Sequence, residues 1–118
     1  MYMLIRSSKI SIDDSNIHGR GIFALDNIIK GEILEECHFF MVPRNLQYPQ
    51  ILMDHFFAWP KNHNPHEMVI CLGYGSIFNH SDIPNADWET DMDKFLIRFI
   101  AIENIDAGQE IFTNYQKS

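Results

Sequence analysis

The stretch FNHSDIPN, at residues 78–85, places four polar side chains in succession and a fifth at its end. Such a cluster commonly forms an Asx-turn followed by a Pro-Asn turn, in which the side chains satisfy nearby backbone groups. Here the cluster directly follows the apolar segment GYGSIF at residues 73–78, so it ends an apolar segment and does not belong to a long polar loop. The stretch is therefore equally compatible with a structural turn and with a binding site.

A second candidate site is the stretch HGRGIFA at residues 18–24, in which Gly19 and Gly21 flank Arg20 just before an apolar run. Glycines at this spacing let the backbone approach a ligand closely and present free N–H groups to it. A plain turn that leads into a strand has the same pattern. Taken alone, the glycine pair does not separate the two interpretations.

The six histidines raise the question of a metal site, because His63 and His66 lie three residues apart and Cys71 follows. This spacing fits no strong zinc pattern, and the sequence offers no second pair of ligands. The segment PKNHNPHE, at residues 60–67, has the composition of a polar surface loop, which explains the histidines. We therefore predict no metal.

Short strands must position these candidate sites, because apolar runs with strand character dominate the sequence. Residues 21–25 and 32–36 read as neighbouring strands joined by a turn that Gly31 closes. Near the end of the chain, a buried strand is predicted at residues 94–102, and Gly108 marks the turn to a last strand at residues 111–115.

One sizeable helix is predicted in the stretch QILMDHFFAW at residues 50–59. Its apolar residues and His55 recur at helical spacing, from Ile51 to Trp59. Pro60 follows and would end the helix, because proline lacks the backbone donor that a helix interior needs. The fold is therefore predicted to be mostly β with a single short helical segment.

The composition indicates one domain, since 118 residues with 46% hydrophobic content can bury a sizeable core. Cys37 and Cys71 do not form a disulfide framework in a chain with such a core, and we expect buried free thiols. The sequence contains no apolar run of membrane-spanning length and nothing that resembles a secretory signal, so we expect a soluble intracellular protein without a membrane partner.

The formal net charge of −7 argues against direct binding to nucleic acid, which depends on clustered lysine and arginine. A basic protein or peptide suits this charge better as a partner.

Taken in order, GRGIFA, the acidic strand after KGE, FNHSDIPN and AGQEIFTNY resemble the SET domain of protein lysine methyltransferases. The resemblance covers about residues 16–115, and the short chain is most similar to the minimal stand-alone SET proteins of large DNA viruses. It implies that residues 1–118 form a single SET domain with a β-clip-like fold of small antiparallel sheets and a variable insert at about residues 38–70. It also implies a knot-like crossing in which the C-terminal segment threads beneath a preceding loop.

The resemblance further implies S-adenosylmethionine as cofactor. Gly19, Arg20 and Gly21 would hold it through backbone groups, while Asn79 would lie near its amino group and the backbone of His80 near its adenine. The protein would then be a protein-lysine N-methyltransferase that acts on a lysine in a basic protein such as a histone tail. If the source is a virus or an effector-producing organism, the host nucleus is one location where it would meet histones.

The catalytic residue implied by the resemblance is Tyr115, at the mouth of a narrow channel where methyl donor and lysine meet. The residues assigned to the channel or peptide groove are Phe56, Phe57, Tyr74, Trp88 and Thr113. Relatives often carry phenylalanine or tyrosine two residues before the catalytic tyrosine. Thr113 is smaller than either, so we predict that the channel permits more than one methylation.

The sequence departs from its relatives after Tyr115. Many relatives continue with an aromatic or cysteine-rich extension that closes over the site, whereas three residues follow Tyr115 in this sequence. Asn114 stands where aspartate is usual, and YQKS replaces the common Tyr-Gly. A bound peptide, a second subunit of a homodimer or another protein would then supply a lid. The alternative is a SET-like module that binds a peptide or partner with little turnover.

Overall fold

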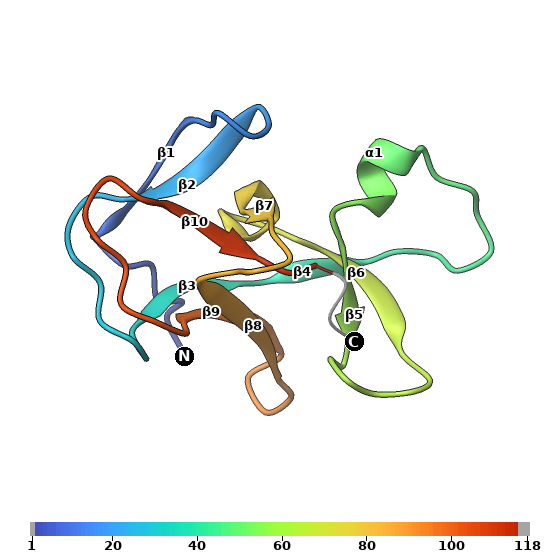
Figure 1. The fold of residues 1–118 in the computed structure, drawn as a ribbon. Coiled ribbons are helices and arrows are strands. Elements are labelled where there is room, and N and C mark those ends of the chain that lie inside the picture. Colours follow the sequence, from blue (N-terminus) through green and yellow to red (C-terminus); the bar gives the residue numbers. More distant parts are fainter. Residues whose placement is uncertain (1, 116–118) are drawn as a thin grey trace.

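Three small β-sheets, one short helix and one 3-10 turn make up the computed structural model, which describes residues 2–115 (Figure 1). The first sheet contains, in spatial order, β1 (Ile10–Asp14), β2 (Arg20–Ala24), β10 (Glu110–Thr113) and β7 (Asn79–His80). The second contains β3 (Ile33–Cys37), β9 (Leu96–Ala101) and β8 (Ala86–Asp91). The third contains β4 (Phe39–Met41), β6 (Glu67–Cys71) and β5 (Phe56–Trp59). The helix α1 spans Gln50–Met53, and the 3-10 turn η1 spans Gly75–Ile77.

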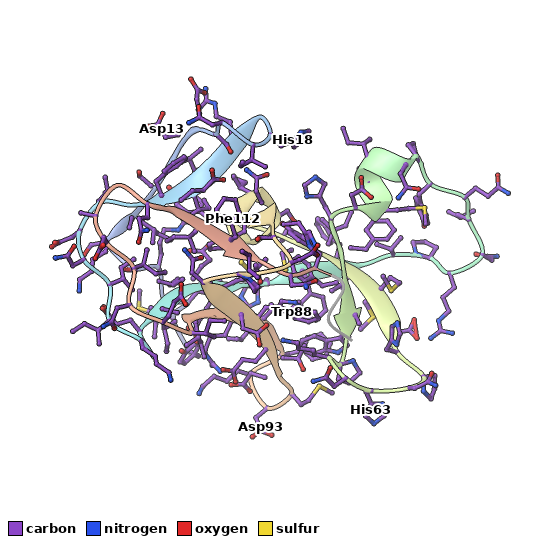
Figure 2. The ribbon with its side chains drawn as sticks, viewed as in Figure 1. Asp13, His18, His63, Trp88, Asp93 and Phe112 are labelled. Atoms are coloured by element: carbon purple, nitrogen blue, oxygen red, sulfur yellow. The ribbon has the colours of Figure 1, made fainter. Side chains whose placement is uncertain are left out.

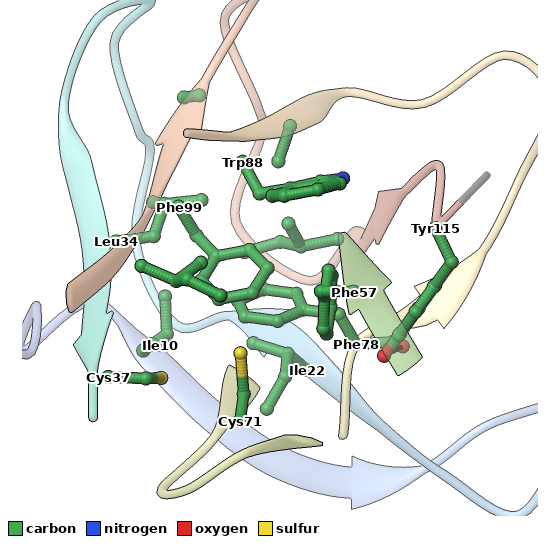
Figure 3. Close-up of a cluster of buried hydrophobic side chains, with 14 of the residues drawn as sticks. Ile10, Ile22, Leu34, Cys37, Phe57, Cys71, Phe78, Trp88, Phe99 and Tyr115 are labelled. Carbon is green, nitrogen blue, oxygen red and sulfur yellow. Dashed lines mark hydrogen bonds between the residues drawn. The ribbon is translucent and has the colours of Figure 1, made fainter. Parts of the chain in front are cut away.

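The pairings within these sheets are antiparallel, except that β10 runs parallel to β7. The predicted mostly β fold of small antiparallel sheets with one short helix is confirmed. Apolar side chains from the three sheets meet in a common core, where Ile22, Phe57 and Phe99 are fully buried (Figure 3). This shared core holds the sheets together, because each is too small to bury its own apolar face.

The C-terminal strand lies between two segments from distant parts of the chain. Ile111 of β10 pairs with Ile22 of β2, and Phe112 pairs with Asn79 of β7 (Figure 1). The side chain of Asn85 bonds this strand twice: its Nδ2 donates to the Glu110 carbonyl at 3.0 Å, and its Oδ1 accepts from the Phe112 N–H at 2.8 Å. Part of the polar cluster at residues 78–85 therefore binds the backbone of the C-terminal strand.

An ionic cluster joins the strands of the second sheet. The Arg98 guanidinium donates to Glu36 Oε2 at 2.7 Å and to Asp91 Oδ2 at 2.9 Å. Burial on its own raises the pKa of Glu36, but hydrogen bonds from the Tyr2 hydroxyl, Arg98 and the Ile5 N–H outweigh burial and hold that pKa below its usual value. Glu36 therefore stays ionised although it is 2% exposed.

The strands predicted at both ends of the chain are present as β2, β3, β9 and β10, with ends shifted by one or two residues. The prediction that residues 21–25 and 32–36 form neighbouring strands was wrong, because β2 pairs with β1 and β10 whereas β3 pairs with β9. Gly31, with φ of 96°, donates its N–H to the Ala101 carbonyl at 2.8 Å. That turn directs the chain into the second sheet and away from β2.

The helix predicted at residues 50–59 was also wrong over its second half. The helix α1 has no buried residue, and Phe56–Trp59 form the strand β5, in which Phe57 pairs with Val69. Phe57 and Val69 are fully buried, so the strand gains apolar burial on the core that a surface helix would forgo. Helical spacing here is overridden by tertiary packing.

The cysteine prediction is confirmed, since Cys37 and Cys71 are buried free thiols. Among residues 2–115, no helix has the length and apolar character needed to cross a membrane.

Candidate active site

A cavity of about 470 Å³ opens between the β1–β2 turn, the helix α1 and the strand β7. Its walls are contributed by Ile17, His18, Gln50, Met53, Asp54, His55, Phe78, Asn79, His80 and Tyr115. The cavity thus collects the turn before β2, the junction between α1 and β5, and the polar cluster at residues 78–85. His18 extends from the β1–β2 turn on the side that faces α1 (Figure 2).

Tyr115 lines this cavity and is 8% exposed. Its hydroxyl donates to the Phe78 carbonyl at 2.5 Å and lies 3.4 Å from the Gly75 carbonyl. Its backbone N–H donates to His80 Nδ1 at 3.2 Å. Burial, with a smaller effect of the nearby cysteine thiols, raises the pKa of Tyr115 far above its usual value. The hydroxyl is therefore protonated at neutral pH and acts as a hydrogen-bond donor.

Asn79 ties the glycine-containing turn to the C-terminal strand. Its Nδ2 lies 3.0 Å from the His18 carbonyl, 3.1 Å from the Arg20 carbonyl and 2.8 Å from Glu110 Oε2. The other oxygen of Glu110 accepts from the Ser15 hydroxyl at 2.7 Å. The turn before β2 is therefore held by side chains from β7 and β10, and its carbonyls point at Asn79.

The two glycines of this turn serve different purposes. Gly19 has φ of 49°, in the left-handed region that glycine adopts without strain. At Gly21 a Cβ atom would lie 2.3 Å from Glu110 Oε2 and 3.0 Å from Asn79 Nδ2. Because Glu110 is fixed by two hydrogen bonds, Gly21 is needed for the close approach of β2 to β10.

Arg20 contributes its backbone and not its side chain to this arrangement. The guanidinium is 68% exposed and pairs with Asp14 at 3.1 Å, outside the cavity. Among the sequence-predicted cofactor residues, Asn79 and His80 line the cavity, whereas the turn borders it through Ile17 and His18 in place of Gly19–Gly21. The carbonyls of His18 and Arg20 accept hydrogen bonds from Asn79, and these bonds hold the turn beside the cavity.

One predicted channel residue, Phe57, packs against Tyr115, and a second, Trp88, packs against Phe57. The Phe57 ring lies 4.6 Å from the Tyr115 ring and 4.9 Å from the Trp88 ring, measured between centroids (Figure 3). Trp88 Nε1 donates to the Asn114 carbonyl at 3.0 Å. Phe57, Trp88 and Thr113 are fully buried or nearly so, at 0%, 1% and 0% exposed. The hydroxyl of Thr113 has no hydrogen-bond partner in the part of the chain that the structure describes.

The other two predicted channel residues pack elsewhere. The Phe56 ring makes an edge contact with Tyr48 at 5.4 Å. The Tyr74 ring lies under the Arg6 guanidinium, 3.6 Å from the guanidinium carbon to the ring centroid. None of the five predicted channel residues is among the described residues that line the cavity, so their channel assignment stays a prediction.

Sequence reasoning missed His55, Asp54 and His18 as wall residues of the cavity. His55 was placed on a helix face, whereas it is the residue immediately before the strand β5. The sequence gives little reason to choose His55, because a single histidine beside apolar residues is common on protein surfaces. Its contact with the Tyr115 ring, which only the three-dimensional structure shows, makes His55 a candidate site residue.

Comparison with known proteins places this geometry in context. The sequence profile of the SET domain matches residues 19–116. The chain is similar to a histone-lysine N-methyltransferase of Schizosaccharomyces pombe described as specific for H3 lysine-37, with 27% identity over 113 residues that cover 92% of this chain and 74% of the relative. A crystal structure of a candidate histone methyltransferase from Plasmodium falciparum superposes with a TM-score of 0.74 at 33% identity, covering 95% of this chain and 96% of that one.

Proposed function

Because the chain belongs to the SET domain family, we propose that it is an S-adenosylmethionine-dependent protein-lysine N-methyltransferase that acts on a basic protein such as a histone tail. The observation that carries the proposal is a single cavity whose wall contains Asn79, His80 and the nearly buried Tyr115. Family relatives described as histone methyltransferases support the substrate class.

The cavity residues fit this cofactor. A volume of about 470 Å³ lies within the range of small-molecule sites, roughly 300 to 1,000 Å³. Apolar walls from Ile17, Met53 and Phe78 suit an adenine ring, and the carboxylate of Asp54 suits a ligand with positive charge. When bound, S-adenosylmethionine supplies an electrophilic methyl group. His18, Asn79 and His80 would hold it from the turn and from β7.

Tyr115 would orient the reacting groups and would not act as a general base. Its raised pKa keeps the hydroxyl protonated, and the Phe78 carbonyl fixes its direction. The Phe57 ring packs on the Tyr115 ring, which leaves Tyr115 only 8% exposed to water. Methyl transfer needs positioning in a dry site more than it needs proton transfer by the protein.

The incoming lysine must be neutral to act as a nucleophile. Its free pKa of about 10.4 falls when the amine is buried among apolar side chains, because burial disfavours the ammonium form. Phe57, which packs on Tyr115, and Trp88 behind it would provide such surroundings for an amine that reached Tyr115. The net charge of −7 favours the approach of a basic protein to this surface.

One observation favours a second candidate function, a SET-like module that binds a peptide or partner with little turnover. Phe57, Trp88 and Thr113 are almost completely buried, so a lysine that approaches Tyr115 between them must displace a side chain. Turnover on this candidate would be slow or absent, whereas cofactor binding would persist.

Methyl transfer from labelled S-adenosylmethionine to core histones and to a matched set of basic peptides tests the proposal. We expect label in a lysine with the wild-type protein and a large loss of label with Tyr115→Phe. Cofactor binding without transfer to any basic substrate would favour the second candidate. Absence of both binding and transfer would refute the enzyme assignment.

A further inference from the structure

His55 lies in the cavity wall at the junction between α1 and β5. Its ring makes an edge contact with the Tyr115 ring, with centroids 5.7 Å apart and planes at 87°. Its Nδ1 is buried and has no hydrogen-bond partner in the described part of the chain. A buried ring nitrogen without a partner, one ring away from the catalytic candidate, calls for a physical explanation.

The buried nitrogen restricts which form the ring adopts. If Nδ1 carried the ring hydrogen, the ring would bury one donor without an acceptor. Leaving a buried donor unpaired costs free energy, and orphaned donors are rarer than orphaned acceptors. Nδ1 is therefore the acceptor nitrogen of the ring, and Nε2–H is the donor that a ligand in the cavity can meet.

The other polar side chains of the wall that lie near Tyr115 already make hydrogen bonds within the protein. The amide nitrogen of Asn79 is shared among three acceptors, and the Tyr115 hydroxyl donates to the Phe78 carbonyl. His80 bonds the Tyr115 N–H through Nδ1 and Asp82 through Nε2, at 3.2 and 3.1 Å. His55 is thus the wall residue beside Tyr115 whose donor is uncommitted.

The charge of the wall indicates what this donor meets. No lysine or arginine is among the described residues that line the cavity, and its one carboxylate is Asp54. S-adenosylmethionine carries a carboxylate, and an anion taken from water into a partly enclosed site needs hydrogen-bond donors. We propose, resting on the proposed function, that His55 binds the carboxylate of the methyl donor through Nε2–H and thereby sets the position of the donor against Tyr115.

Two ligands separate this contact from a general effect on the site. S-adenosylhomocysteine carries the amino-acid carboxylate, whereas 5′-methylthioadenosine retains the adenosine and lacks that group. By calorimetry, His55→Phe is expected to weaken S-adenosylhomocysteine by about 10- to 100-fold, as for the loss of a hydrogen bond to a charged group. Binding of 5′-methylthioadenosine should change by less than about 3-fold, because phenylalanine preserves the packing on Tyr115.

His55→Gln supplies a rescue test, since the glutamine amide reaches the position of the imidazole Nε2 and can donate from it. We expect most of the lost affinity to return in this variant. His63→Phe is the matched control, because His63 lies on a loop at the opposite end of the molecule from His18 and the cavity (Figure 2). That variant should bind both ligands like the wild type, and thermal unfolding checks that every variant is folded.

Unchanged affinity of His55→Phe for S-adenosylhomocysteine would overturn the inference and leave the proposed function standing. Equal losses for both ligands, or a loss that follows His18→Phe and not His55→Phe, would also overturn it. Failure of the wild-type protein to bind S-adenosylhomocysteine would refute the proposed function itself. If His55→Phe does not fold, nitrogen NMR of the wild-type His55 ring decides: a shift of Nε2 with S-adenosylhomocysteine but not with 5′-methylthioadenosine is expected, and equal or absent shifts contradict the contact.

Discussion

Replacing Asn79 by alanine removes the group that holds the turn before β2 against the C-terminal strand. The side chain is 7% exposed, and its single amide nitrogen lies within 3.1 Å of the His18 carbonyl, the Arg20 carbonyl and Glu110 Oε2. Alanine would leave all three acceptors without this partner. The turn would then lose its main tie to β7, although Ser15 would still hold the other oxygen of Glu110.

The magnitude follows from the number of hydrogens available. An amide nitrogen has two, so at most two of the three acceptors at Asn79 are fully bonded at one time. One bond to a carbonyl contributes about 1 kcal/mol and one to a carboxylate about 1.5 to 3 kcal/mol. We therefore expect Asn79→Ala to lower the free energy of unfolding by about 2 to 4 kcal/mol.

The cofactor effect of the same change is separable from the stability effect. Asn79 also lines the cavity, so Asn79→Ala should weaken S-adenosylhomocysteine by about 1 to 3 kcal/mol in calorimetry. Asn85→Ala is the matched control, because Asn85 bonds the backbone of the C-terminal strand without lining the cavity. That variant should lose stability by a comparable amount, measured by urea unfolding, while retaining most of its ligand affinity.

A loss below about 0.5 kcal/mol in Asn79→Ala would contradict the hydrogen-bond reasoning, since that is the lower bound for one ordinary bond. Equal losses of affinity in Asn79→Ala and Asn85→Ala would show that the cofactor effect is only a consequence of lower stability.

Three further predictions concern other parts of the molecule. Tyr115→Phe should lower the free energy of unfolding by about 1 kcal/mol, because the Phe78 carbonyl loses its donor. The variant should lose most methyl transfer but still bind S-adenosylhomocysteine in calorimetry, and unchanged turnover would show that the hydroxyl has no part in the mechanism. The folded-state pKa of Glu36 is depressed, so its stabilising contribution is complete above the unfolded pKa of about 4.3 and is lost as pH falls through the folded pKa. The melting temperature should therefore fall between about pH 5 and pH 3, and fall less in Arg98→Met; equal slopes in both proteins would contradict this cause. Because Thr113 is small, we expect mass spectrometry under excess cofactor to detect dimethylated or trimethylated product. Product that remains monomethylated would show that the channel is tight, and Trp88→Ala would then test whether the buried Trp88 side chain is the obstruction.

The strands that the sequence predicted are those whose residue types agree with their surroundings. The run at residues 94–102 is β-branched and aromatic, and it forms β9 at the centre of its sheet. The strands β1, β4, β6 and β8 were not predicted individually. β8 reads ADWETD, with acidic residues on one face, and two of them are satisfied by Arg98 from the neighbouring strand. This ion pairing depends on a residue from another strand, so the sequence of residues 86–91 alone does not indicate it.

Two wall residues of the cavity, Asn79 and His80, were assigned to the candidate site from the resemblance in motif order. The spacing of Gly19 and Gly21 indicated a turn, and the polar cluster at residues 78–85 indicated Asn79 as a candidate site residue. The sequence could not predict that Asn79 holds the turn in place, because its three hydrogen-bond acceptors lie 31 to 61 positions away along the chain. His55 was misplaced for the same reason that β5 was: the spacing at residues 50–59 fits a helix, and only packing on the core selects the strand.

The most direct test of the central claim, that the cavity at Tyr115 binds the methyl donor, is an NMR titration of the isotopically labelled protein with S-adenosylhomocysteine. If the methyl donor binds there, saturable shifts are expected in the backbone signals of residues in the cavity wall, namely His18, His55, Asn79, His80 and Tyr115. Signals from the cavity beside the strand β3, lined by Arg6 and Gly73, should stay unchanged. Saturable shifts confined to that second cavity, or no saturable shift anywhere, would show that the methyl donor does not bind at Tyr115.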